Sequence, residues 1–376
     1  MCGSLVIAAI LSVVASRSRR TPVADRSALE RAPQASYIGS QSCAGCHPGE
    51  FASHSRSGHA RTLRPAALTK VASRLSGATF ADPEHRGVGW SYSLRDGRLW
   101  TERREAGEVE RFLIDYAFGS GHHATTFVTL TNRTPESPTM IEHRLTVFAH
   151  KEAPDITPGQ GQAPSSNRRG MVPLGRSYLT WGTLKCFECH TTVVSDRGPL
   201  VLDEATMIPN VGCERCHGPG RAHVEAARRE AGDAALAMPF GLGRFTAADE
   251  IRMCGACHRL PEMGDSALIR PDNAVLVRFQ PVGLMQSACY QKSQGTLSCA
   301  TCHDPHAKTS TDLPAYEAVC LSCHRAPSQT ACKVSHATGC VGCHMPRRDV
   351  SQGMMMADHW IRSRPENAAN TPPPVR

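Results

Sequence analysis

Cys213-Glu-Arg-Cys216-His217 is one of seven segments with the same spacing, two cysteines three positions apart followed at once by a histidine. Fourteen of the 17 cysteines fall into this pattern. With 18 histidines in 376 residues, a histidine at all seven positions has a chance probability on the order of one in a billion. The other six segments are Cys43-Ala-Gly-Cys46-His47, Cys186-Phe-Glu-Cys189-His190, Cys254-Gly-Ala-Cys257-His258, Cys299-Ala-Thr-Cys302-His303, Cys320-Leu-Ser-Cys323-His324 and Cys340-Val-Gly-Cys343-His344.

The spacing has a chemical reason. In a helical turn, cysteines at i and i+3 share a face and can form thioethers to the two vinyl groups of one porphyrin, while the next histidine reaches the iron. Zinc-binding cysteine pairs are the alternative, but they do not require a histidine at the next position every time. The sequence therefore predicts seven covalently attached c-type haems, with proximal ligands His47, His190, His217, His258, His303, His324 and His344.

The composition is consistent with haem groups supplying much of the apolar core. Hydrophobic residues make up 40% of the chain but aromatic residues only 5%, with 31 glycines and 26 prolines, so a conventional apolar core is thin for this length. Seven porphyrins amount to roughly one large apolar plate per fifty residues. We expect the chain without haem to be largely unfolded, as metal-dependent domains are without their metal.

Eleven histidines outside the motifs are candidates for the second axial position. His306 lies three residues beyond a proximal histidine, His223 begins an amphipathic helix predicted over Ala222–Ala237, and His59 follows the first motif closely. His122 and His123 lie in a glycine-rich loop that either delivers a ligand to a haem or is a polar hairpin tip. Methionines, including Met345 and Met354 to Met356, are weaker alternatives to bis-histidine ligation.

The long stretch between the first and second motifs predicts β structure. Trp90 to Leu94 and Arg98 to Thr101 alternate across an Asp96-Gly97 turn, which is typical of a hairpin. Val109 to Ala117 and Thr125 to Leu130 continue the meander. The predicted fold is a mostly α-helical and irregular haem-packed body with a β-rich insertion. Its predicted segments are 1–16 signal peptide, 17–77 first haem segment, 78–150 β-rich insertion, 151–170 linker, 171–361 six-haem body and 362–376 disordered tail.

The N-terminal segment indicates export. Leu5 to Val14 is an apolar run of the length of a signal-peptide core and too short to span a bilayer. We therefore expect a periplasmic or extracellular protein, with no transmembrane segment in the mature chain. In an oxidising compartment, Cys289 and Cys332, which lie outside the motifs, can pair, stay free or touch a haem.

These motifs carry a resemblance. The chain resembles the multihaem cytochromes related to cytochrome c-554 and to the pentahaem nitrite reductases. The resemblance implies distal haem ligands at His59, His223, His306, His336 and His359, with His122 or His123 as a sixth candidate. It rests on Tyr37-Ile-Gly-Ser-Gln-Ser-Cys43, Ser57-Gly-His59, Gly119-Ser-Gly121, Val211 to His223, Leu297 to His306, His336 with Cys340 to Pro346, and Asp358-His359-Trp-Ile361.

The formal charge of +8 does not indicate nucleic-acid binding. Ionised propionates and the iron change it to about +1 with ferric haems and about −6 with ferrous haems. Two functional classes remain. If every iron has two protein ligands, the protein is an electron carrier between redox proteins, which is the favoured prediction. If one iron is five-coordinate, it is an oxidoreductase acting on a small nitrogen or sulfur oxyanion such as nitrite, or on hydroxylamine. No motif ends in lysine, which argues against a close copy of the nitrite reductases.

Overall fold

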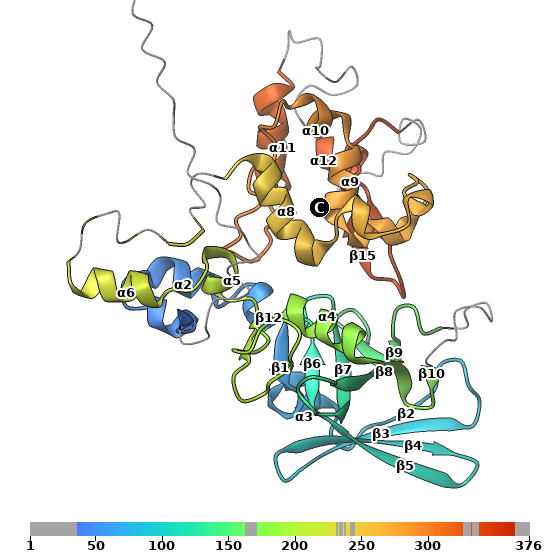
Figure 1. Cartoon of the computed structure of the whole chain (residues 1–376). Helices are drawn as coiled ribbons and strands as arrows, with labels where there is room; N and C mark the ends of the chain where they lie inside the picture. Colours follow the sequence, from blue (N-terminus) through green and yellow to red (C-terminus); the bar gives the residue numbers. More distant parts are fainter. Residues whose placement is uncertain are drawn as a thin grey trace, which may run out of the picture.

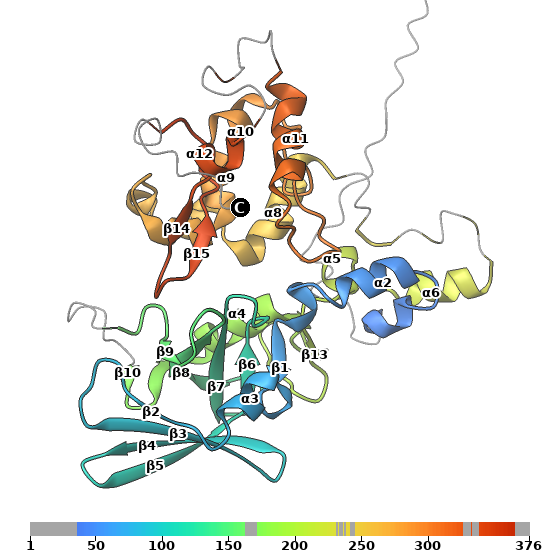
Figure 2. The same ribbon diagram turned by 180° about the vertical axis from the view of Figure 1, so that it is seen from behind.

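The computed structural model separates the chain into a β-rich part and a helical part that carries most of the motifs (Figure 1). The short helices α2 (Pro48–His54), α5 (Cys213–His217) and α6 (Arg221–Arg228) extend to one side, as the view from behind confirms (Figure 2). The predicted signal peptide and most of the predicted tail lie outside the described residues. The structure describes residues 36–161, 171–230, 232, 236, 238–240, 245–325, 332 and 338–364.

The larger sheet is antiparallel, in the order β1-β6-β7-β8-β11-β10, with β9 paired to β8. Gly175 is required where β11 pairs with β8, because a Cβ there would lie 2.0 Å from the carbonyl oxygen of Glu142. The sheet extends beyond the predicted insertion at both ends, since β1 precedes residue 78 and β9 to β11 follow residue 150. Its strands are β1 (Leu63–Pro65), β6 (Tyr116–Phe118), β7 (Ala124–Asn132), β8 (Thr139–Phe148), β9 (Asp155–Ile156), β10 (Met171–Val172) and β11 (Gly175–Tyr178).

The smaller sheet is a meander of β2 (Thr79–Ala81), β3 (Val88–Arg95), β4 (Arg98–Glu105) and β5 (Glu108–Ile114). The predicted hairpin is confirmed: β3 pairs antiparallel with β4, and Asp96 and Gly97 have φ of 51° and 68°, as a tight two-residue turn requires. The single strand predicted over Val109–Ala117 is interrupted at Asp115. There the chain leaves β5 in one sheet and enters β6 in the other.

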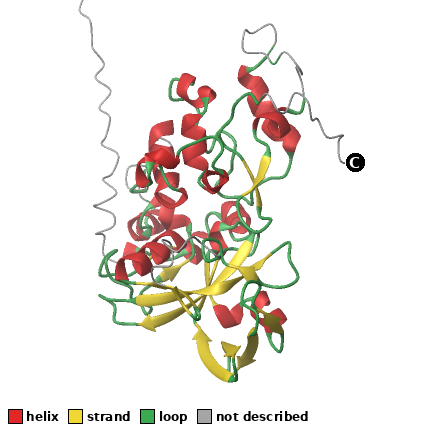
Figure 3. Cartoon of the chain, turned by 90° about the vertical axis from the view of Figure 1, so that its right-hand side faces the viewer, coloured by secondary structure: helices red, strands yellow, loops and turns green. Residues whose placement is uncertain are grey.

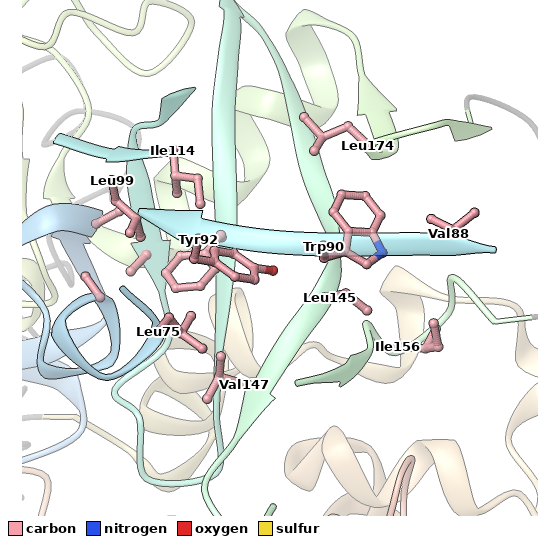
Figure 4. Close-up of a cluster of buried hydrophobic side chains, with 14 residues drawn as sticks. Leu75, Val88, Trp90, Tyr92, Leu99, Ile114, Leu145, Val147, Ile156 and Leu174 are labelled. Carbon is pink, nitrogen blue, oxygen red and sulfur yellow. The ribbon is translucent and has the colours of Figure 1, made fainter. Parts of the chain in front are cut away.

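The two sheets enclose an apolar core (Figure 4). Along β3, buried and half-buried residues alternate, so that Val88, Trp90 and Tyr92 face inward, as the period of a strand dictates. They belong to one cluster with Leu145 and Val147 of β8. Each large side chain buried there contributes roughly 1.5–3 kcal/mol relative to an exposed one. This part of the chain therefore has a conventional core.

The motifs stand mostly at the ends of short helices. The third and seventh motifs are themselves helices, α5 and α12, and the second and fourth motifs end α4 and α8, so their cysteines lie one helical turn apart. The sixth motif closes α11, and its histidine follows directly. In the view of Figure 3, helices and loops dominate this end of the molecule. The remaining helices are α3 (Lys70–Leu75), α4 (Thr180–His190), α8 (Ala247–His258), α9 (Gln280–Gln286), α10 (Ala288–Lys292), α11 (Leu313–Cys323) and α12 (Cys340–His344).

Short elements connect these helices. Two small antiparallel pairs join β12 to β13 and β14 to β15. None of the helices in the described ranges combines the length and the apolar character needed to cross a membrane. The short elements are η2 (Ser40–Cys43), η3 (His59–Arg61), η4 (Ala66–Leu68), η7 (Pro261–Met263), η8 (Ser266–Leu268), η9 (Ala274–Arg278), β12 (Thr191–Val193), β13 (Ile208–Pro209), β14 (Arg347–Asp349) and β15 (Met355–Ala357).

Two local predictions need correction. The helix predicted over Ala222–Ala237 begins at Arg221 and ends at Arg228. Glu230 adopts a left-handed φ of 52°, which an α-helix cannot continue through. Part of the range predicted as a linker is structured. There β9 pairs with β8 and extends the larger sheet, and Gln160 is buried. Residues 162–170 of that range lie outside the described residues.

Candidate functional site

Four imidazole pairs join a motif histidine to a histidine from elsewhere in the chain. Their ring centroids lie 6.0 to 6.3 Å apart. In every pair the second ring is one of the predicted distal ligands. The pairs are His47 with His223 at 6.3 Å, His258 with His59 at 6.2 Å, His217 with His306 at 6.0 Å and His303 with His359 at 6.1 Å.

This separation fits one iron between two imidazoles. A bond from a first-row metal to an imidazole nitrogen is about 2 Å long, and the nitrogen lies about 1 Å from the ring centre, so two axial ligands have centroids about 6 Å apart. The rings of His122 and His123, which face each other and no motif histidine, lie closer, with centroids 4.8 Å apart. The four gaps therefore have the size that bis-histidine haem ligation requires.

A hydrogen bond from Nδ1 to a backbone carbonyl oxygen fixes the orientation of two rings of these pairs, His223 and His359, and of two further motif histidines, His190 and His344. When Nδ1 donates to a carbonyl oxygen, Nε2 is left to bind the metal. The carbonyl partner is two residues away for His359 and 128 residues away for His190. The contacts of Nδ1 are with Thr62 O for His190 at 2.9 Å, Leu236 O for His223 at 2.7 Å, Arg362 O for His344 at 3.0 Å and Ala357 O for His359 at 3.0 Å.

Burial favours the neutral imidazole, which is the form that binds a metal. Desolvation lowers the pKa of His359 to about 4 and lowers the pKa of His190 and His258 as well. His190 and His359 are partly buried, whereas His258 is exposed. The lowered pKa values favour the uncharged rings at neutral pH.

Backbone contacts hold the distal histidines in place. The carbonyl oxygen of His59 accepts a hydrogen bond from Val211 N at 3.0 Å, which ties the first haem segment to the third motif. The carbonyl oxygen of His359 accepts one from the Ser287 hydroxyl at 3.0 Å. Gly283 allows this approach, because a Cβ there would lie 2.7 Å from Trp360 N. His59 and His359 are therefore each positioned by a segment far away in the sequence.

Motif cysteines from different motifs also meet. The side chains of Cys43 and Cys213 lie close enough for each to shift the pKa of the other. The same holds for Cys189 with Cys257 and for Cys254 with Cys299. The first motif thus adjoins the third, the second adjoins the fourth, and the fourth adjoins the fifth.

Two glutamates that the sequence did not single out lie at these contacts. The Glu214 carboxylate, buried within the third motif, accepts hydrogen bonds from the backbone of Ile38, Gly39 and Gly220. The Glu250 carboxylate lies near the sulfurs of Cys254 and Cys299. Glu250 precedes Cys254 by one helical turn, a spacing visible in the sequence. Its contact with the fifth motif is visible only in the structure.

His190 has different surroundings. Its ring lies against the phenyl ring of Phe118, with centroids 4.8 Å apart, and it belongs to none of the four imidazole pairs. The motif cysteine Cys186 is partly buried, and the desolvation raises the pKa of its thiol to about 12. The second motif is therefore enclosed by protein on the side of the β-rich part.

Other predicted residues are not brought to a motif histidine among the described residues. His122 and His123 are exposed and their rings lie against each other. His336 lies outside the described residues. Cys289 lies close enough to Cys323 to interact with it electrostatically, and burial raises the pKa of the Cys289 thiol.

Three comparisons show which known proteins the chain is similar to. Residues 173–218, which contain the second motif and the third, match the family described as cytochrome c554 and c-prime. The chain is 22% identical over 387 aligned positions to the dissimilatory sulfite reductase MccA of Wolinella succinogenes, covering 82% of this chain. It spans about half the length of that relative, 50%. The crystal structure of the outer cell wall cytochrome OcwA aligns with a TM-score of 0.45 and 14% identity, covering 87% of this chain and 80% of that one.

The motifs, the imidazole pairs and these matches lead to one conclusion. Cysteine pairs followed by histidine supply covalent attachment and a proximal ligand, and the facing histidines supply the second axial position. The chain carries the haem-attachment motifs of multihaem c-type cytochromes and is similar to members of that group.

Proposed function

We propose that this chain binds seven c-type haems and carries electrons between redox proteins outside the cytoplasm. The observation that carries the proposal is the set of four imidazole pairs at 6.0 to 6.3 Å. Haem with two histidine ligands exchanges single electrons and leaves no axial position for a substrate. In this proposal, the histidines of the four pairs occupy both axial positions of four haem irons.

The pairs also link the motifs to one another. His306 lies three residues from His303 and faces His217, so the third and fifth sites are neighbours. His223 follows the third motif and faces His47 of the first. His59 follows the first motif and faces His258 of the fourth. Each distal ligand thus comes from the segment of another motif, which holds the sites close together.

The cysteine contacts define a route along these sites. The sulfurs of Cys189 and Cys257 place the second site against the fourth, and those of Cys254 and Cys299 place the fourth against the fifth. Haems attached at neighbouring sulfurs would lie close enough to exchange electrons. Cys46, Cys302, Cys323 and Cys343 are exposed, so the first, fifth, sixth and seventh sites offer edges to partner redox proteins.

A second candidate function is a reductase centred on His190. His190, like His344, belongs to none of the imidazole pairs, and its ring contacts the apolar ring of Phe118. The similarity to a protein named as a sulfite reductase also supports this candidate. A five-coordinate iron at the second motif would accept a small oxyanion such as sulfite or nitrite. The remaining sites would then deliver electrons to it.

One spectroscopic experiment separates the two functions. After mass spectrometry has counted the haems, the oxidised holoprotein is measured by electron paramagnetic resonance with and without sulfite or nitrite. Seven haems with only low-spin signals that neither anion changes are the result expected for a carrier. A high-spin signal that shifts with sulfite or nitrite identifies an open site and favours the reductase.

A variant tests the pairing itself. His306→Ala removes the ring that faces His217, so we expect one new high-spin signal while the other sites keep their spectra. His85→Ala is the matched control, because His85 is half-exposed and contacts Asp82 in the β-rich part at 3.4 Å. Unchanged spectra in His306→Ala would show that this imidazole is not a ligand.

A further inference from the structure

Glu250 joins the fourth motif to the fifth. It lies on α8, one turn before Cys254. Its Oε2 accepts a hydrogen bond from the Ser298 hydroxyl at 2.7 Å, and its Oε1 accepts one from Ala300 N at 2.5 Å. Ser298 and Ala300 flank Cys299. One carboxylate therefore fastens the helix that ends in the fourth motif to both sides of the first cysteine of the fifth.

The same carboxylate lies beside the two attachment sulfurs. A carboxylate oxygen of Glu250 and the sulfurs of Cys254 and Cys299 all lie within 4.8 Å of one another. Both sulfurs belong to haem-attachment motifs, so this cluster is not a separate metal site. It marks the place where the edges of two neighbouring porphyrins would meet, with a carboxylate next to both.

Glu214 repeats the arrangement at another junction. Its side chain is buried, and its oxygens accept hydrogen bonds from Ile38 N at 3.0 Å, Gly39 N at 2.8 Å and Gly220 N at 2.8 Å. Ile38 and Gly39 begin the segment that enters the first motif, and Glu214 interacts electrostatically with both Cys43 and Cys213. A carboxylate thus clamps the first motif to the third in the way that Glu250 clamps the fourth to the fifth.

The contact between the second motif and the fourth lacks this feature. Glu188, next to Cys189, forms an ion pair with Lys185 at 2.7 Å on the surface of α4. Its charge is therefore balanced by a neighbour on its own helix. The clamp is a property of two particular junctions and does not follow from having an acid beside a motif cysteine.

We propose that Glu250 and Glu214 are positioning residues that fix the contact between two haem sites each and lower the reduction potentials of both. This inference rests on the proposed haem attachment. A negative charge beside the attachment points of two haems stabilises the ferric forms relative to the ferrous forms, and net charge and hydrogen bonding set haem potentials. Because each carboxylate lies between two sites, it would lower the potentials of both together.

The test is a redox titration of the holoprotein carrying Glu250→Gln, which keeps the shape and removes the charge. We expect seven haems by mass, unchanged low-spin spectra, and two redox steps moved to more positive potential. Glu262→Gln is the matched control, because Glu262 is exposed on η7, and its titration should superimpose on that of the native protein. A superimposable curve for Glu250→Gln with seven haems bound overturns the inference.

A second variant covers the case in which Glu250→Gln fails to load haem. Glu250→Asp keeps the charge but withdraws the carboxylate by about 1.5 Å, one carbon–carbon bond. We expect the same two steps to move in the same direction by a smaller amount, and an unchanged curve would again overturn the inference. If the native protein itself lacks haem at the fourth or fifth motif, that result contradicts the proposed seven-haem function. It is distinct from a failure of the inference about Glu250, which requires an unchanged titration with seven haems bound.

Discussion

The β-rich part and the helical part of this chain are built on different principles. In the β-rich part, fourteen buried residues form one apolar cluster, with Trp90 and Phe127 among its fully buried members. In the helical part, the two clusters contain three buried residues each, one around Ile251 and one around Val277. The first part has the core of an ordinary domain, whereas the second has little apolar material of its own.

The difference shows where haem is needed for folding. An apolar core of the size found between the two sheets stabilises a small domain by itself. The helical part instead brings motif histidines and predicted distal histidines together in pairs. We therefore expect its free energy of folding to come largely from bound haem, as in metal-dependent domains.

The largest expected effect is therefore the loss of haem attachment. In a chain with the fourteen motif cysteines changed to serine, we expect the helical part to unfold while strands β3, β4, β7 and β8 stay folded. Hydrogen exchange measures this directly: amides of these strands should remain protected and those of α8 and α11 should exchange at once. Equal loss of protection in both parts would show that the β-rich part depends on haem too.

Trp90→Ala should produce the next largest effect. It removes a side chain that is 2% exposed and whose Nε1 donates to Asp82 at 3.1 Å, so the β-rich part should lose about 3–5 kcal/mol in its free energy of unfolding. Denaturant titration followed by circular dichroism gives this value, while the haem absorption should keep its native midpoint. Trp90→Phe, which removes mainly the hydrogen bond, should cost less. A shift of the haem midpoint by a similar amount would mean that the two parts unfold together.

A smaller, pH-dependent effect is expected from His143 in β8. Burial lowers its pKa to about 3, so below the ordinary value of 6.5 the unfolded chain binds a proton that the folded chain does not. The β-rich part should then lose up to about 1.4 kcal/mol per pH unit as the pH falls from 6.5 towards 3. His143→Gln keeps a polar group opposite the Thr129 hydroxyl and removes the titration. Identical pH slopes for the two proteins would contradict this prediction.

The smallest effect should come from the surface of the smaller sheet. Arg103 pairs with Glu110 at 3.3 Å, and the Glu110 side chain is 44% exposed. Glu110→Gln should change the free energy of unfolding by less than about 1 kcal/mol, because solvent screens such a pair. Chemical denaturation at low and high salt is the measurement. A larger change in the free energy of unfolding would show that surface ion pairs, and not only the apolar core, stabilise this sheet.

The β hairpin and the haem ligands illustrate what pattern can predict. Asp96-Gly97 between two alternating strands was sufficient for the hairpin, because turn geometry depends on neighbouring residues alone. The same local logic failed at Glu230, where the chain leaves the predicted helix. Of the five distal histidines implied by family resemblance, four face a motif histidine in the structure, and His336 lies outside the described residues.

The sequence by itself determined the chemistry of the sites, since a cysteine pair followed by histidine places three reactive groups within five residues. Which histidine faces which motif was decided only by the tertiary structure: His59 faces His258, 199 positions away (258 minus 59). The clamps made by Glu214 and Glu250 were decided there as well. Such contacts join segments that are remote in sequence, and no local periodicity or spacing encodes how those segments pack.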